Sequence, residues 1–120
     1  MKSYKELIVW QKSIQLCTEI YKETSKFPKN EMYGLVSQIR RSAVAIPSNI
    51  AEGYLRGHRS EYIQFLRIAY SSGAELESQL IISRNISYIN SVTFQKLNSA
   101  LEEIMKMLNR LINVLLNPRP

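Results

Sequence analysis

The residues best suited to chemistry gather between positions 38 and 57, where the chain reads QIRRSAVAIPSNIAEGYLRG. This stretch carries Arg40, Arg41, Asn49, Glu52 and Arg56 among small and apolar residues. An arginine guanidinium is a planar fork that binds a carboxylate or a phosphate through two hydrogen bonds. The stretch therefore allows two kinds of chemistry: ion pairing within or between subunits, and binding of nucleic-acid phosphates.

Arginine is the only basic residue type in the central part of the chain. Between Arg40 and Arg67 there are five arginines, two glutamates and no lysine. In a structural interpretation the arginines pair with glutamate and with carbonyls at helix ends. That structural or interface network consists of Arg41, Pro47, Asn49, Glu52 and Gly53. In a functional interpretation the outward-facing groups bind RNA or DNA. Those candidates are Arg40, Arg56, Arg59 and His58, although a solvated loop histidine is the simpler explanation of His58.

Spacing limits which of these groups meet. Arg41 and Glu52 are eleven residues apart, which is about 16 Å along a helix axis, so they cannot touch within one helix. Glu52 can reach Arg56 four residues later if the helix continues that far. Asn49 carries a donor and an acceptor, so it can bond the carbonyl that Pro47 leaves free or cross an interface.

The usual constellations of an enzyme are absent from the sequence. His58 is the only histidine, so one subunit cannot build a histidine metal site or a Ser-His-carboxylate triad. Cys17 is the only cysteine, which excludes an internal disulfide, and we expect it to be a small buried hydrophobe. No Walker loop, GxGxxG or CxxC motif occurs. We therefore expect no catalysis, metal or cofactor.

Length and composition predict a single domain over residues 1–120. The chain has a net charge of +6, a pI near 9.6 and no aspartate. Aspartate is a poor residue inside helices, so its absence suits a helical protein. The positive charge permits an anionic partner without requiring one. Apolar runs are too short for a membrane span and no signal-peptide core is visible, so we expect a cytoplasmic protein.

Helices are predicted at about 4–26, 31–54 with a kink at Pro47, 60–85 and 92–116. Each carries an apolar stripe with a period of about 3.5 residues, which favours an all-α, up-down-up-down antiparallel four-helix bundle. The stripe residues are Leu7, Trp10, Ile14, Cys17 and Tyr21 in the first helix, Met32, Val36, Ile39, Ala43, Ile46 and Ile50 in the second, Tyr62, Leu66, Ala69, Gly73, Leu76 and Leu80 in the third, and Leu97, Leu101, Ile104, Leu108, Leu111 and Leu115 in the fourth.

Several residues mark helix boundaries and close contacts. Ser3 and Glu6 have the spacing of a capping box. Gly53 and Gly57 are candidate stops for the second helix. Gly73 lies inside the third helix, where glycine costs about 1 kcal/mol relative to alanine, so we expect another helix to approach it closely.

A second set of apolar residues lies off the stripes. It either widens the core-facing side of each helix or forms a subunit interface. Its members are Ile8, Leu35, Val44, Phe65, Ile68, Ile81, Ile82, Met105, Ile112 and Leu116.

The stretch QIRRSAVAIPSNIAEGYLR, with FPKNEMYGL before it and EYIQFLRIAYSSGAELESQL after it, resembles a known signature. It is similar to that of the small four-helix bundle proteins encoded in intervening sequences of bacterial large-subunit ribosomal RNA genes. The resemblance implies a four-helix bundle that forms a ring-shaped homopentamer. A related group, the accessory protein of diversity-generating retroelements, works with nucleic acid and a reverse transcriptase.

These observations favour a non-enzymatic, basic, homo-oligomeric bundle that associates with nucleic acid through arginines near the kink. The alternative is a structural or protein-interaction scaffold whose arginines are used in its own subunit interfaces. A partner protein is compatible with both hypotheses.

Overall fold

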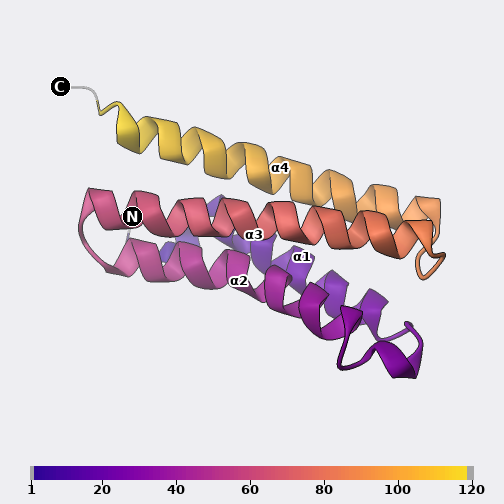
Figure 1. Cartoon of the computed structure of the whole chain (residues 1–120). Helices are drawn as coiled ribbons and strands as arrows, with labels where there is room; N and C mark the ends of the chain where they lie inside the picture. The colour runs from indigo at the N-terminus through magenta and orange to yellow at the C-terminus, as the bar shows by residue number, and fades with distance from the viewer. Residues whose placement is uncertain (1, 119–120) are drawn as a thin grey trace.

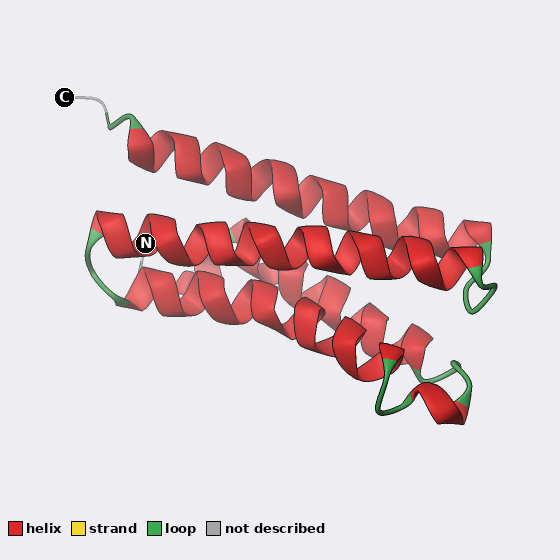
Figure 2. Ribbon diagram, viewed as in Figure 1, coloured by secondary structure: helices red, strands yellow, loops and turns green. Residues whose placement is uncertain are grey.

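The computed structural model describes residues 2–118 and consists of helices joined by short connections. The four long helices are α1 (Ile8–Thr24), α2 (Leu35–Leu55), α3 (Arg59–Asn85) and α4 (Ser91–Leu116). Two short 3-10 helices, η1 (Tyr4–Glu6) and η2 (Lys29–Glu31), precede α1 and α2. No strand occurs in the described part of the chain, as the colouring of Figure 2 shows. The prediction of an all-α protein is confirmed.

The helices form an elongated bundle of 52 × 23 × 20 Å. The chain reverses direction between successive helices, so neighbours are antiparallel and the order is up-down-up-down (Figure 1). Helix α1 packs on α2, α2 on α3 and α3 on α4, and α1 closes the ring against α4. The predicted four-helix bundle is therefore present. No helix of residues 2–118 is long and apolar enough to cross a membrane.

The core follows the predicted stripes in α3 and α4 and, from Val36 to Ile50, in α2. Met32, the first predicted stripe residue of the second helix, is 42% exposed because it lies in the turn before α2. The core departs from the predicted stripe in α1. The predicted stripe residues Ile14 and Tyr21 are 40% and 42% exposed. The buried face of α1 is turned by one position and consists of Val9, Ser13, Leu16, Ile20 and Thr24. Its two polar members are tolerated because their hydroxyls bond carbonyls of the same helix, Ser13 Oγ at 2.6 Å from Val9 O and Thr24 Oγ1 at 2.7 Å from Ile20 O.

The start of the first helix is also corrected. Leu7 is extended, with φ −69° and ψ 123°, and separates η1 from α1. Ser3 Oγ accepts a hydrogen bond from the N–H of Lys5, while Glu6 Oε2 accepts one from the N–H of Lys2. The expected reciprocal capping box is therefore replaced by two local bonds around a 3-10 turn, and α1 ends at Thr24 rather than near residue 26.

The second helix begins later than predicted. After η2 the chain turns through residues 32–34, and Gly34 has φ −116° and ψ −110°, which interrupts the helix. Helix α2 therefore starts at Leu35 instead of residue 31. The turn leaves Tyr33 97% exposed. Helices α3 and α4 begin within one residue of the predicted positions and end where predicted.

Helix α2 continues through Pro47, and Figure 1 shows its ribbon changing direction along its length. Gly53 does not stop this helix, because it lies inside α2 and is buried. A Cβ placed on Gly53 would lie 2.6 Å from Phe65 Cβ, so its role is close approach of α3. Gly57, with φ +78°, takes the left-handed conformation that follows the helix end.

Gly73 meets the expectation of a close helix contact. A Cβ at this position would lie 3.1 Å from both Cγ and Sδ of Met105 on α4. The two glycines therefore allow α3 to approach α2 on one side and α4 on the other.

Candidate nucleic-acid interface

Arg40 is engaged within its own subunit. Its Nε donates to Thr24 Oγ1 at 3.0 Å and its Nη2 donates to the carbonyl of Tyr21 at 3.3 Å. The guanidinium also lies 4.5 Å from the centre of the Tyr21 ring. These contacts place a positive charge at the carbonyl end of α1, where the helix dipole favours it. Arg40 therefore joins α2 to the end of α1.

Arg56 is engaged at the junction of α2 and α3. Its Nη2 lies 3.1 Å from Glu52 Oε1, which is the predicted i,i+4 pair, and its Nη1 lies 3.7 Å from Glu61 Oε2. The guanidinium also lies 4.9 Å from the centre of the Phe65 ring. A phosphate bound at Arg56 would have to compete with two carboxylates.

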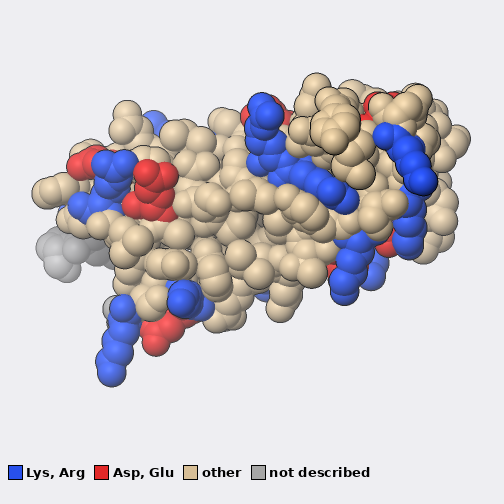
Figure 3. All heavy atoms as spheres, turned by 90° about the horizontal axis from the view of Figure 1, so that it is seen from below, with Lys and Arg blue, Asp and Glu red and all other residues tan. Residues whose placement is uncertain are grey.

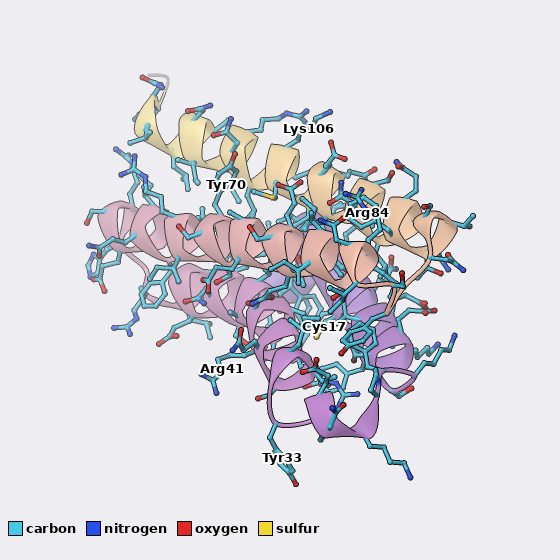
Figure 4. The ribbon with its side chains drawn as sticks, turned by 45° about the vertical axis from the view of Figure 1, so that its right-hand side comes forward. Cys17, Tyr33, Arg41, Tyr70, Arg84 and Lys106 are labelled. Carbon is cyan, nitrogen blue, oxygen red and sulfur yellow. The ribbon has the colours of Figure 1, made fainter. Side chains whose placement is uncertain are left out.

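Asn49 forms a hydrogen bond within α2, whereas the Arg41 side chain has no partner. Asn49 Nδ2 donates to the carbonyl of Ala45 at 2.7 Å and thus stays within α2; the carbonyl that Pro47 leaves free belongs to Ala43. Arg41 is exposed, and its side chain forms no hydrogen bond or ion pair with any residue of 2–118. Figure 4 shows it pointing away from the bundle.

The basic groups that follow Arg56, in the connection and in the first half of α3, are exposed to solvent. His58 is exposed and is the residue that precedes α3, with no side-chain capping bond. Arg59 and Arg67 are exposed and have no side-chain partner within the described chain. The five central arginines therefore divide into two that are engaged in the fold, Arg40 and Arg56, and three that are not.

Most of the other ion pairs are formed by lysines. Lys12 binds Glu103 at 2.6 Å, Lys22 and Lys96 lie near Glu19, and Lys26 binds Glu23. Viewed from below, Lys and Arg side chains are scattered over a largely uncharged surface, with carboxylates beside some of them (Figure 3). These pairs are solvent-exposed, so each contributes little to stability.

A polar surface on α4, which the sequence analysis missed, carries unpartnered cations. It consists of Lys106, Asn109, Arg110, Asn113 and Asn117, which line a shallow hollow of about 550 Å³. Lys106 points away from the bundle (Figure 4). The signal was present in the sequence: α4 has no acidic residue after Glu103, and the basic pair and the three asparagines each repeat every four residues. We call this surface the α4 face.

A second hollow lies between the end of α1 and the outer side of α2. This α1–α2 groove has a volume of about 620 Å³, and its lining includes Tyr21, Met32, Tyr33, Arg41, Val44 and Ser48. Most of this lining is apolar, and no carboxylate contributes to it.

Reactive groups are few. Among residues 2–118, no cluster of three or more His, Cys, Asp or Glu side chains has the arrangement of a metal site. Cys17 is half-buried and free, and burial raises the pKa of its thiol. The hydroxyl of Tyr88 donates to Glu31 Oε2 at 2.7 Å, and this bond raises the pKa of Tyr88.

Comparisons with known proteins agree with this fold. Residues 5–110 match the family model described as 23S rRNA-intervening sequence protein. A solved structure from Bacteroides thetaiotaomicron, described as a protein with unknown function from the S23 ribosomal protein family, superposes with a TM-score of 0.79. That protein is 28% identical over 88% of this chain and 98% of its own. A search of curated proteins finds no match.

Proposed function

This chain belongs to the 23S rRNA-intervening sequence protein family, and we propose that it is a non-enzymatic, basic bundle that associates with the phosphates of nucleic acid. We also propose that it assembles with copies of itself. The family description refers to ribosomal RNA, and the charges of this chain support the binding chemistry.

The observation that carries the proposal is the imbalance between unpartnered cations and unpartnered carboxylates. Eight basic side chains in the described chain have no hydrogen bond, ion pair or ring contact, whereas Glu75 and Glu77 are the two such glutamates. The eight are Lys2, Lys5, Lys29, Arg41, Arg59, Arg67, Lys106 and Arg110. A surplus of solvated positive charge attracts a polyanion, and binding releases its condensed counterions.

The α4 face is the most suitable contact surface. Lys106 and Arg110 lie one turn apart on α4 and supply two charges that form no ion pair in the described chain. Helix α4 has no acid after Glu103, and the carboxylates of Glu77 and Glu102 line an adjoining hollow with Lys106. Asparagine amides beside them can donate to phosphate or sugar oxygens. Arg40 and Arg56, which the sequence suggested, are less suitable because their guanidinium groups already have partners.

The test is a salt series of nucleic-acid binding on two matched variants. Lys106→Ala/Arg110→Ala removes two unpartnered charges. Lys22→Ala/Lys26→Ala removes two charges that are paired with Glu19 and Glu23 of α1. We expect the α4 variant to reduce the log–log salt slope by about 1.4–1.8, since each phosphate contact contributes about 0.7–0.9. The control variant should change it much less. If both variants reduced the salt slope equally, nucleic-acid binding would depend on net charge alone and not on the α4 face.

Self-assembly is supported by apolar side chains that the single bundle leaves exposed, among them Ile8, Ile68 and Ile82. Isolated apolar residues are normal on a surface, but this number suits a subunit interface. Light scattering on a sizing column should therefore give a mass several times 13.9 kDa. A monodisperse monomer at micromolar concentration would remove this part of the proposal.

The second candidate function is a protein scaffold. It is favoured by the engagement of Arg40 and Arg56 in the fold, which leaves the central motif as a structural element. Absence of measurable nucleic-acid binding at low salt, combined with stable assembly, would select the scaffold.

A further inference from the structure

The α1–α2 groove has a composition unlike that of the rest of the surface. It is open, mainly apolar and about 620 Å³ in volume, which is within the range of about 300–1,000 Å³ typical of sites for small ligands. It lies away from the α4 face: Figure 4 shows Tyr33 and Arg41 pointing down from the bundle and Lys106 pointing up. The groove therefore needs an explanation separate from the α4 face.

Tyr33 is the most unusual residue of the groove. It is 97% exposed, although a tyrosine ring normally gains stability from burial. The turn that presents it is ordered by hydrogen bonds from Met32 N–H to the carbonyl of Lys29 and from Gly34 N–H to the carbonyl of Glu31. The ring is thus displayed on a defined turn and has both faces free for a flat apolar partner.

The charges around the groove specify an anionic partner. Arg41 lines it and has no partner in the described chain, and Arg40 lies over the Tyr21 ring at its border. No carboxylate contributes to its lining. A partner that fits must combine flat apolar surface with negative charge, and an unpaired nucleotide has both.

We propose that the α1–α2 groove binds unpaired nucleotides of single-stranded RNA or DNA, with a base stacked on Tyr33 and a backbone phosphate bound by Arg41. The hydroxyls of Ser37 and Ser48, which also line the groove, are available to base or sugar atoms. This proposal rests on the proposed association with nucleic acid and adds a preference for single strands. A paired base has its faces covered by its neighbours and cannot stack on Tyr33.

A second copy of this chain is the alternative occupant. An apolar helix face of a copy would cover Met32 and Val44, but Arg41 would then need a carboxylate from that copy to avoid an unpaired buried charge. Assembly mass measured on the same variants distinguishes the two occupants.

The test is fluorescence anisotropy with a labelled oligouridine of about 12 nucleotides, a length within the site sizes of single-strand-binding folds. An RNA duplex of equal length is the reference probe. We expect Tyr33→Ala to weaken oligouridine binding by about five- to one-hundred-fold, the equivalent of one stacked base. Tyr33→Phe should bind within about twofold of the wild type, because its ring still stacks. Arg41→Ala should weaken oligouridine binding and reduce its salt slope by about 0.7.

Two controls make the result specific. Val92→Ala removes an exposed apolar side chain at the start of α4, outside the groove, and should leave oligouridine binding unchanged. Duplex binding should respond to Lys106→Ala/Arg110→Ala and not to Tyr33→Ala.

The groove proposal is overturned if Tyr33→Ala binds oligouridine as well as Val92→Ala does, even while the α4 variant loses affinity, and in that case the proposed function stands. It is also overturned if Tyr33→Ala or Arg41→Ala dissociates the assembly, because the groove is then occupied by a second copy. Failure of the wild type to bind either probe at low salt would remove the proposed function and the groove proposal together.

Discussion

Gly53 and Phe65 lie at the closest approach of α2 and α3: a Cβ built on Gly53 would be 2.6 Å from the Cβ of Phe65. The same Cβ would lie 3.3 Å from the carbonyl oxygen of Tyr62, so backbone as well as side chain blocks it. Glycine is therefore required here by packing, because its φ is not in the left-handed region. The close approach brings Arg56 within reach of Glu61 and joins the end of α2 to the start of α3.

Gly53→Ala should destabilise the protein by about 1–3 kcal/mol in urea unfolding, because the two helices must separate to admit a methyl group. Gly73→Ala is the matched comparison, since its obstacle is the flexible side chain of Met105 and its cost should be smaller. Alanine is favoured over glycine inside a helix by about 1 kcal/mol. Stabilisation by that amount at Gly53 would show that the contact is loose.

Arg40→Ala should destabilise the protein by about 1–3 kcal/mol, because it removes a charged hydrogen bond to the buried hydroxyl of Thr24 and another to the carbonyl of Tyr21. Arg41→Ala is the control in the adjacent position and should change stability by less than about 0.5 kcal/mol. In nucleic-acid binding the order should be reversed, with Arg41→Ala losing more affinity than Arg40→Ala. Equal stability of the two would mean that Arg40 is not a structural residue.

Periodicity in the sequence predicts most of the fold because the bundle buries one side of each helix. The periodicity predicts the wrong buried face in α1, because two apolar stripes lie side by side on that helix. Trp10, Ile14 and Cys17 form the more regular stripe, but the core takes the other one, whose pattern is interrupted by Ser13 and Thr24. Local hydrogen bonds satisfy the hydroxyls of these two residues. The choice between the two stripes depends on how α1 packs against α2 and α4.

The candidate surfaces were less predictable for a similar reason. The pair Glu52–Arg56 follows from helix spacing, and its 3.1 Å contact confirms it. The contacts of Arg40 with Thr24 and Tyr21 span 16 and 19 residues, so local spacing cannot indicate them. The absence of acids after Glu103 indicates the α4 face, but residues at such spacing are also typical of an ordinary solvated helix side.

Tyr88→Phe tests the contact between the α3–α4 connection and η2. The hydrogen bond to Glu31, followed by burial and by the charge of Glu31, raises the pKa of Tyr88 above 10.0. A raised pKa favours the neutral phenol in the folded state, so the contact is fully stabilising below the ordinary pKa and is lost as pH rises through the raised one. The stability advantage of the wild type over Tyr88→Phe should therefore shrink as the pH rises above 10.0, the ordinary pKa of tyrosine. An advantage independent of pH would contradict this assignment.

Cys17 should react slowly with a thiol reagent at mildly alkaline pH, because it is half-buried and its pKa is raised by burial. Reaction in urea provides the reference rate of the unfolded chain. A folded protein that reacts as fast as the unfolded one would mean that α1 opens locally near Cys17.

Pro47→Ala tests whether the bend of α2 serves the fold. Proline has no N–H for the carbonyl of Ala43, so alanine restores a hydrogen bond and raises helix propensity by up to about 3 kcal/mol. A straighter α2 cannot keep both of its ends in place, however, because Arg40 bonds to the end of α1 in the first half and Gly53 fits against Phe65 in the second. We expect unchanged helix content by circular dichroism, a Tm no higher than that of the wild type, and reduced assembly mass by light scattering. The double variant Pro47→Ala/Arg40→Ala should lose less stability than the sum of its two single variants, since the straightened helix has already strained the Arg40 contacts. A higher Tm with unchanged assembly mass would contradict this prediction, because it would mean that the bend is not needed to position either end of α2.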